Sequence, residues 1–369
     1  KPRKIVIVES LAINDVLLRF ENTEDENLSI GAGFERFAVS MTNGTVRLDN
    51  LYVNNPGRLE TENLFHLDAA TVQLLPGSIY SSNIVINAVD VKNPHVFVER
   101  NAETDTIAEF LKIANGLVAK IPTNRPVAAA TNEVVAVAAE ETEPAPPPPE
   151  IALELFTLEN LRLNVVDAED PELNLTLGLE QVTAALERGD IQLDNLYIAN
   201  PARLRSPHLF LLTRLGVELA PGSLKEETLI IENITVEKPH VTLELTPETD
   251  TVHELLKLAN GFIERAPSYP RPPTPAAPPA EPLADADAAP AKPPVEVRAL
   301  RVDDIQIRLL DNSSTNHVSP TPNTLARIES ISMDLLTGKL KVNEITVPNV
   351  EGFTATNIFH LANIDVDID

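Results

Sequence analysis

The feature that most constrains this chain is a long internal repeat. Residues 49–56 read DNLYVNNP and residues 194–201 read DNLYIANP, so the second copy follows the first at an offset of 145 positions. A third, shorter copy begins near Val295, and its residues 357–361 (NIFHL) repeat residues 63–67 (NLFHL). The offset of 145 also joins residues 76–78 to 221–223, 92–96 to 237–241, and 103–106 to 248–251. Colinear matches at constant spacing predict a tandem array of one supersecondary unit.

Two segments of different composition separate the copies. Residues 122–150 are rich in Ala, Val and Glu and end in a run of prolines, and residues 266–294 carry eleven prolines. Such segments favour extended polyproline II, at about 3.1 Å per residue, so each could reach ~90 Å. They are either solvated spacers or segments that lie along a neighbouring domain or subunit. We therefore divide the chain into repeat 1 (1–121), a linker (122–150), repeat 2 (151–265), a linker (266–294) and a partial repeat 3 (295–369).

Within each copy the pattern is mostly that of β-strands. Short segments rich in β-branched residues, often alternating with polar ones, predict strands. In the first copy they cover residues 5–8, 13–20, 34–41, 45–53, 65–75, 83–91 and 95–99. The predicted fold class is β-rich α+β: tandem repeats of a curved, twisted antiparallel sheet, each closed by one C-terminal helix and joined by Pro-rich linkers.

One irregularity recurs in these strands. The apolar phase slips by one residue between Leu48 and Leu51, and the same slip occurs in the second and third copies. A period-2 strand keeps both halves facing the core only if an extra residue is inserted. We interpret Asp49-Asn50, Asp194-Asn195 and Asn343-Glu344 as β-bulges that bend the strand. A second slip falls between residues 86 and 89 and between residues 231 and 234.

A helix is predicted at the end of each complete copy. Thr106 with Glu109, and Thr251 with Glu254, have the spacing of a capping box. One apolar stripe follows in each copy: Ile107, Phe110, Leu111, Ala114 and Leu117 in the first, and Val252, Leu255, Leu256, Ala259 and Phe262 in the second. Gly116 and Gly261 are placed as C-terminal caps. The stripe predicts that each helix packs on the sheet or closes its end.

Composition excludes several classes of function. The chain has 29 Lys and Arg against 55 Asp and Glu, a net charge of −26, which argues against nucleic-acid binding and against docking on anionic lipid headgroups through a basic patch. It contains no Cys, which removes thiol catalysis, disulfides and Cys-ligated zinc. It also contains no Trp, and no segment reads as a signal peptide or a membrane-spanning helix.

No catalytic constellation stands out. His66 and His360 occupy equivalent positions, as do His95 and His240, and such repetition favours a structural role over metal ligation. No nucleotide-binding glycine loop or nucleophile elbow occurs. Acidic clusters at residues 24–26, 167–170 and 365–369 are interpreted as solvated faces, with calcium binding left open. We therefore predict a protein that is not an enzyme and has no cofactor.

The residues resemble a known family. Residues 345–353 (ITVPNVEGF) followed by 357–361, and residues 51–57 (LYVNNPG) followed by 64–67 (LFHL), are similar to the AsmA-like repeat of bacterial envelope proteins. Residues 89–96 and 234–241 are similar to the end of that repeat. The resemblance implies an elongated, twisted antiparallel sheet with an apolar concave face, in proteins that span the periplasm and carry or regulate lipids. It therefore implies an extracytoplasmic location, in the periplasm or envelope.

Three functions follow as hypotheses. The first is an envelope protein that handles lipid acyl chains or organises the outer membrane, with a groove or core lined by Ile7, Val46, Leu48, Val72 and Leu74. The second is a protein secreted to the cell surface that self-assembles head-to-tail into a fibre, because the third copy ends halfway through the unit. Its predicted assembly edge consists of Ile358, Phe359, Leu361, Ile364, Val366 and Ile368. The third, an enzyme, has no supporting constellation.

Overall fold

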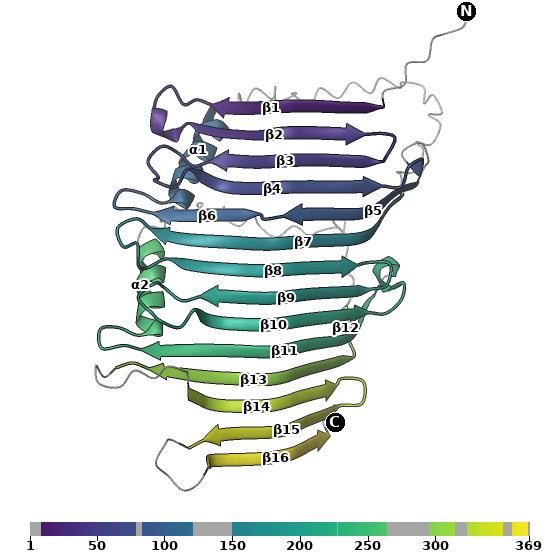
Figure 1. Cartoon of the computed structure of the whole chain (residues 1–369), viewed down its shortest axis with the longest axis vertical. Coiled ribbons are helices and arrows are strands. Elements are labelled where there is room, and N and C mark those ends of the chain that lie inside the picture. Colours follow the sequence, from purple (N-terminus) through teal and green to yellow (C-terminus); the bar gives the residue numbers. More distant parts are fainter. Residues whose placement is uncertain are drawn as a thin grey trace, which may run out of the picture.

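The described part of the chain forms one large mixed β-sheet. The computed structural model describes residues 9–78, 83–120, 150–226, 228–263, 295–313, 323–349 and 356–367. Sixteen strands belong to the sheet, and the two helices α1 and α2 lie at the same end of the strands, each beside its own group (Figure 1). Among the residues described, neither helix is long and apolar enough to cross a membrane.

The elements follow the sequence repeat. The first group is β1 (Ser10–Phe20), β2 (Ile30–Ser40), β3 (Thr45–Asn54), β4 (Asn63–Leu74), β5 (Asn83–Lys92), β6 (His95–Arg100) and α1 (Thr106–Lys120). The second is β7 (Glu150–Asp167), β8 (Leu175–Ala185), β9 (Asp190–Ala199), β10 (His208–Leu219), β11 (Leu229–Leu245) and α2 (Thr251–Ile263). The third is β12 (Val295–Val297), β13 (Ala299–Asp311), β14 (Asn323–Asp334), β15 (Lys339–Pro348) and β16 (Asn357–Asp367).

The three groups share one sheet, which the sequence did not predict. The pairs within each group are antiparallel, and β5 and β6 both pair with β4. Between groups the pairs are parallel: β7 pairs with β5 and β6, and β11 pairs with β12 and β13. The sheet as a whole is therefore mixed: strands of one group pair antiparallel, as predicted, and the parallel pairs join one group to the next. The predicted strand at residues 5–8 and almost all of both predicted linkers lie outside the described residues; Glu150, assigned to a linker, begins β7.

Strand pairing is interrupted along one line that crosses the sheet. Between β3 and β4 the ladder passes from Asp49–Ala69 to Leu51–Leu67 without pairing Asn50, which has a φ of 50°. The ladder between β8 and β9 breaks in the same way at Asn195, with a φ of 53°. Between β14 and β15 it breaks at residues 343 and 344. The predicted irregular pairing at all three sites is confirmed.

The mechanism of the break differs from the predicted bulge. The register is the same on both sides of each break, because the neighbouring strand is interrupted at the facing residue. No extra residue is inserted. Instead, the alternation of side chains between the two faces shifts by one residue in all strands along one line, which we call the kink row. True one-residue bulges occur at the second slip, where β5 has Asn87 and β11 has Glu232 in excess over the partner strand.

Left-handed residues mark the kink row. They are Asp15, Asn50, Asn93, Asn160, Asn195, Lys238, Asp304 and Asn363, with φ between 50° and 54°. Asn and Asp tolerate this conformation better than other non-glycine residues. Side-chain hydrogen bonds run along the row, for example from Asn93 Nδ2 to Asp68 Oδ2 at 2.6 Å and from Asn160 Nδ2 to Asn93 Oδ1 at 2.9 Å. At the kink row, each strand therefore shifts by one residue the pattern of side chains that face either side of the sheet.

The helices begin and end differently from the prediction. Asp105 and Asp250, not the threonines, cap the helices, because their Oδ1 atoms accept from the amides of Ala108 at 2.8 Å and His253 at 2.9 Å. The amide of Glu99 in β6 donates to Thr106 Oγ1 at 2.8 Å. Gly116 and Gly261 lie inside the helices, so their assignment as C-terminal caps is wrong.

Candidate functional site

One face of the sheet is covered by rows of apolar side chains. Residues that pair directly across strands point to the same side, so the registers define each row. One row runs through Ile13, Phe37, Leu48, Ala70, Val91, Leu158, Val182, Leu193, Leu215, Val236, Val302, Ile331, Val342 and Ile364. The next runs through Leu11, Val39, Val46, Val72, Val89, Phe156, Ala184, Ile191, Val217, Ile234, Leu300, Met333, Leu340 and Val366.

Two further rows lie beyond the kink row. One includes Leu161, Leu179, Leu196 and Leu212 in the middle of the sheet. The other includes Leu163, Leu177, Ile198, Phe210 and Val241. Because each strand changes phase at the kink row, these residues face the same side as the first two rows. We call the surface formed by the four rows the apolar face.

The apolar face is not sealed into a core. Most of its side chains are half-buried, including Leu48, Leu193 and Val342, and those on the outer strands are more exposed, with Leu18 at 69% and Phe359 at 48%. Fourteen strands lie side by side, so four rows cover about 20 Å by 60 Å, on the order of 1,200 Å². The largest apolar patch on an ordinary soluble monomer is about 300–600 Å².

The predicted lining residues lie on or beside this face. Val46 and Val72 pair directly, and Leu48 lies two residues from Val46. Leu74 pairs with Ile86 at the bulge. These four side chains are half-buried, and Ile7 lies outside the described residues.

The predicted assembly edge is the last strand of the sheet. β16 pairs with β15, and four of its apolar residues continue the four rows of the apolar face: Phe359, Leu361, Ile364 and Val366. Ile358 is 66% exposed and lies at a register shift between β15 and β16, while Ile368 lies outside the described residues.

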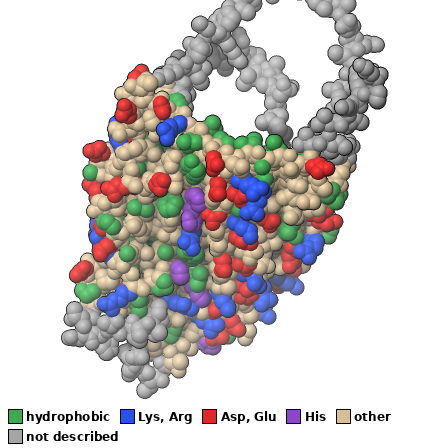
Figure 2. Space-filling view, turned by 45° about the horizontal axis from the view of Figure 1, so that its top comes forward, with side chains coloured by type: hydrophobic (Ala, Val, Ile, Leu, Met, Phe, Trp, Pro, Cys, Tyr) green, Lys and Arg blue, Asp and Glu red, His purple; other side chains and the backbone are tan. Residues whose placement is uncertain are grey.

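The opposite face is polar and charged. Arg214 lies between Asp194, at 3.1 Å, and Glu237, at 3.9 Å, on neighbouring strands. Figure 2 shows His side chains following one line across this part of the surface, beside acidic and basic side chains. One sheet therefore has a charged side and an apolar side.

The histidines belong to one row of the polar face. His66 pairs with His95, and His95 pairs with Arg162. Burial lowers the pKa of His95 below its ordinary value of 6.5, and Arg162 acts in the same direction. Burial also lowers the pKa of His240, near Arg308. Within the described ranges, no group of three His, Asp or Glu residues is arranged to hold a metal ion.

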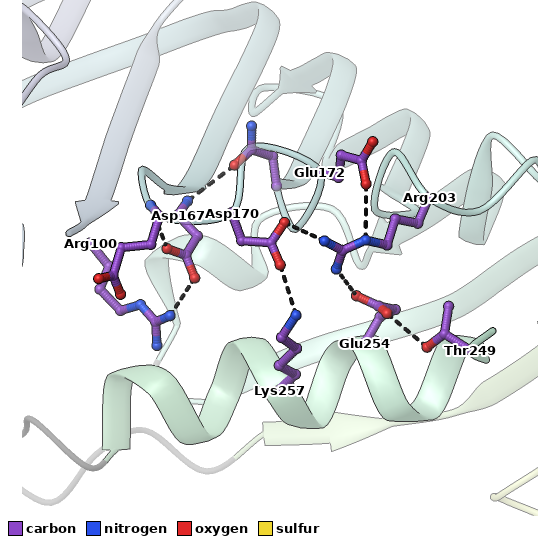
Figure 3. Close-up of polar contacts among 10 residues, drawn as sticks. Arg100, Asp167, Asp170, Glu172, Arg203, Thr249, Glu254 and Lys257 are labelled. Atoms are coloured by element: carbon purple, nitrogen blue, oxygen red, sulfur yellow. Dashed lines mark hydrogen bonds and ion pairs between the residues drawn. The ribbon is translucent and has the colours of Figure 1, made fainter. Parts of the chain in front are cut away.

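Ion clusters join each helix to the end of the sheet, and the second is drawn in Figure 3. Arg203 binds Asp170, at 2.5 Å, Glu172, at 3.0 Å, and the buried Glu254 of α2, at 3.2 Å. Lys257 also binds Asp170, at 2.7 Å. The first copy repeats the arrangement around Arg58, which binds Asp25 at 2.5 Å and the buried Glu109 of α1 at 3.0 Å.

These clusters satisfy buried carboxylates and so serve structure. Glu99 is fully buried and accepts from the amides of Glu60 and Thr61 at 2.7 and 2.6 Å. Arg100 pairs with the buried Asp167 and lies against Gly261 of α2, thereby joining the first and second groups of elements. Two of the acidic clusters considered for calcium thus contribute Asp25, Asp167 and Asp170 to pairs with cationic side chains. The sequence analysis missed the arginines, although Arg58 and Arg203 recur at the offset of 145.

An open pocket lies at the edge of the sheet. It has a volume of about 880 Å³ and is bordered by β1, the loop after it, and the ends of β3 and β4, including Arg19, Tyr52 and His66. The pocket is open and its lining mixes charges with apolar groups.

Comparisons with known proteins do not assign this chain to a family. No family model matches this sequence, and no curated protein sequence matches it.

Proposed function

We propose that this protein is a non-enzymatic component of the bacterial cell envelope that carries lipid acyl chains on its apolar face. The single observation behind the proposal is the two unbroken rows of apolar residues from β1 to β16, on a sheet of one layer. In this proposal the chain is a tandem array of AsmA-like repeats, each a set of strands closed by one helix, and its role is lipid handling or organisation of the outer membrane.

The energetics of burial support an apolar ligand. Each methylene group removed from water contributes about 0.8 kcal/mol, so an acyl chain lying across several rows gains several kcal/mol. The surface offers few polar partners, which suits a ligand recognised by its chain rather than its headgroup. The charged opposite face keeps the protein soluble while the apolar face is occupied.

The kink row supports the same role. Without it, the alternation of each strand would carry Leu51 and Val53 to the face opposite Val46 and Leu48. Left-handed residues in about every second strand thus keep the whole width of one face apolar. Stability alone does not require this on a single-layered sheet, whereas a binding surface for long chains does.

The location follows from the same proposal. An extracytoplasmic protein that meets lipid between membranes needs neither Cys nor a basic headgroup site, and the chain has no Cys and a net charge of −26. Fractionation of native cells with an antibody to this chain tests the location.

The test of function compares two matched double variants. Leu193→Glu with Leu215→Glu places charges at paired positions of the apolar face, on β9 and β10. Thr183→Glu with Thr235→Glu places them on the polar face, on the flanking strands β8 and β11. Native mass spectrometry and lipid extraction of the purified proteins should find bound acyl lipid in the wild type and in the threonine variant, and a loss in the leucine variant. A wild-type protein free of lipid, or equal lipid in both variants at equal folding by circular dichroism, would show the proposal to be wrong.

A further inference from the structure

Within the part of the chain that the structure describes, the two outer strands of the sheet are each paired on one side only. Among the described strands, β1 pairs with β2 alone and β16 pairs with β15 alone. Leu18 of β1 is 69% exposed and Phe359 of β16 is 48% exposed. An uncovered edge with apolar side chains is a template for pairing with another strand.

We infer that β16 of one chain pairs antiparallel with β1 of a second copy, so that the sheet continues from molecule to molecule. This inference does not depend on the proposed lipid function. The strand directions allow it: following the antiparallel and parallel pairs through the sheet, β16 runs opposite to β1. Copies stacked in the same orientation therefore bring these two strands together as an antiparallel pair.

The backbone of the two edges selects the partner. β1 has left-handed Asp15, with a φ of 54°, in its middle, and β16 has left-handed Asn363, also with a φ of 54°. A regular strand could pair with only one half of either edge, because the kink would take the other half out of register. A second copy of this chain brings a strand with a break at the matching place.

The side chains agree with one register. When the breaks are aligned and the apolar faces are kept on the same side, Leu11 faces Val366, Ile13 faces Ile364 and Leu18 faces Phe359. On the polar side, Asp365 faces Ala12 and Asp367 faces Ser10. Within Ser10–Phe20 and Asn357–Asp367, this register opposes no like charges.

In two inner strands, the edge that corresponds to the open edge of β1 is paired with another strand. Asn160 of β7 and Asp304 of β13 are the counterparts of Asp15, and both of these strands have their outer edge covered, by β5 and β6 or by β11. β1 is the strand of this type whose edge is open in the described structure. The preceding strands cover β7 and β13 by parallel pairing, whereas β16 of the second copy would cover the same edge of β1 by antiparallel pairing.

The absence of Cys permits a direct crosslinking test on the full chain. The variant Ala12→Cys with Asp365→Cys places thiols at facing positions of the inferred junction. Because β1 and β16 lie about 60 Å apart in one molecule, any crosslink between them joins two molecules. The matched control, Ala12→Cys with His360→Cys, keeps both thiols on the polar side but five residues out of register.

Oxidation or a short bismaleimide, followed by denaturing electrophoresis, reads out the result. The in-register variant should give a ladder of multimers at least fivefold stronger than the control. Adding Ile13→Lys to it, which places a charge in the junction, should abolish the ladder while the circular dichroism spectrum is unchanged. Absence of a ladder, or equal ladders in register and out of register, would overturn the inference.

Discussion

At the scale of single residues, two cross-strand pairs show how close this sheet packs. Tyr197 faces Gly178 and its ring occupies the space of a Cβ atom there, and Tyr52 lies over Gly33 in the same way in the first copy. In each pair the aromatic ring covers the backbone of the glycine on the facing strand. A larger side chain does not fit at the glycine position.

Replacing Gly178 tests this packing. Gly178→Ala should reduce the free energy of unfolding by about 1–3 kcal/mol, because the new methyl group displaces the Tyr197 ring. Gly216→Ala is the matched control, since its Cβ would meet Thr235 Cβ at 4.0 Å, and its effect should stay within about 0.5 kcal/mol. Urea unfolding followed by circular dichroism measures both. Equal effects of the two substitutions would contradict the proposed packing.

At the scale of elements, the helices depend on buried ion pairs at the end of the sheet. Arg203→Met leaves the carboxylate of Glu254, which is 3% exposed, with Thr249 but without its cation. Because Arg203 is itself partly exposed, we expect a loss of about 1–3 kcal/mol rather than the larger cost of a fully buried pair. Hydrogen exchange should also become faster in α2.

An exposed arginine provides the control for this prediction. Arg188 is 75% exposed and its partner Asp190 is 55% exposed. Arg188→Met should therefore change the unfolding free energy by less than about 1 kcal/mol. If the two arginine variants are equally stable, the cluster around Arg203 does not hold the helix.

Acid should weaken the same cluster. The hydrogen bond from Lys257 lowers the pKa of Asp170 below its ordinary value of 3.8, against the opposite effect of burial, and Arg203 adds to the lowering. Because the folded-state pKa lies below the unfolded one, the stabilisation is complete above 3.8 and is lost as the pH falls through the folded-state pKa. Asp170→Asn should therefore lose less stability than the wild type between about pH 6 and pH 2. Identical pH dependence in urea melts would count against this.

Local patterns predicted most elements and missed what depends on distant residues. The phase slip at Asn50 is visible in the sequence because the apolar residues on its two sides must share a face. The helix start was misplaced by one residue because Thr106 bonds back to β6, a contact that no capping pattern records. Gly261 lies inside α2, where it leaves room for Arg100, a residue far away in the sequence.

At the scale of the whole molecule, the single sheet was the least predictable feature. The pairing of β5 and β6 with β7 joins strands that a long Pro-rich segment separates in the sequence, and nothing local marks it. Its consequence is large, since three short apolar surfaces become one. The ion clusters are again non-local, and only their repetition at Arg58 and Arg203 could have indicated them.

The central claim is that acyl chains bind along the whole apolar face, and site-specific fluorescence tests it most directly. In this Cys-free chain, single Cys variants at Leu48, Leu193 and Val342 sample one row in β3, β9 and β15. Cys variants at Arg47, Gln192 and Lys341 sample the polar face beside them. With an environment-sensitive dye on each Cys, adding a long-chain fatty acid should shift the emission to the blue at all three apolar positions and at none of the polar ones. No shift at the apolar positions, or equal shifts on both faces, would contradict the account.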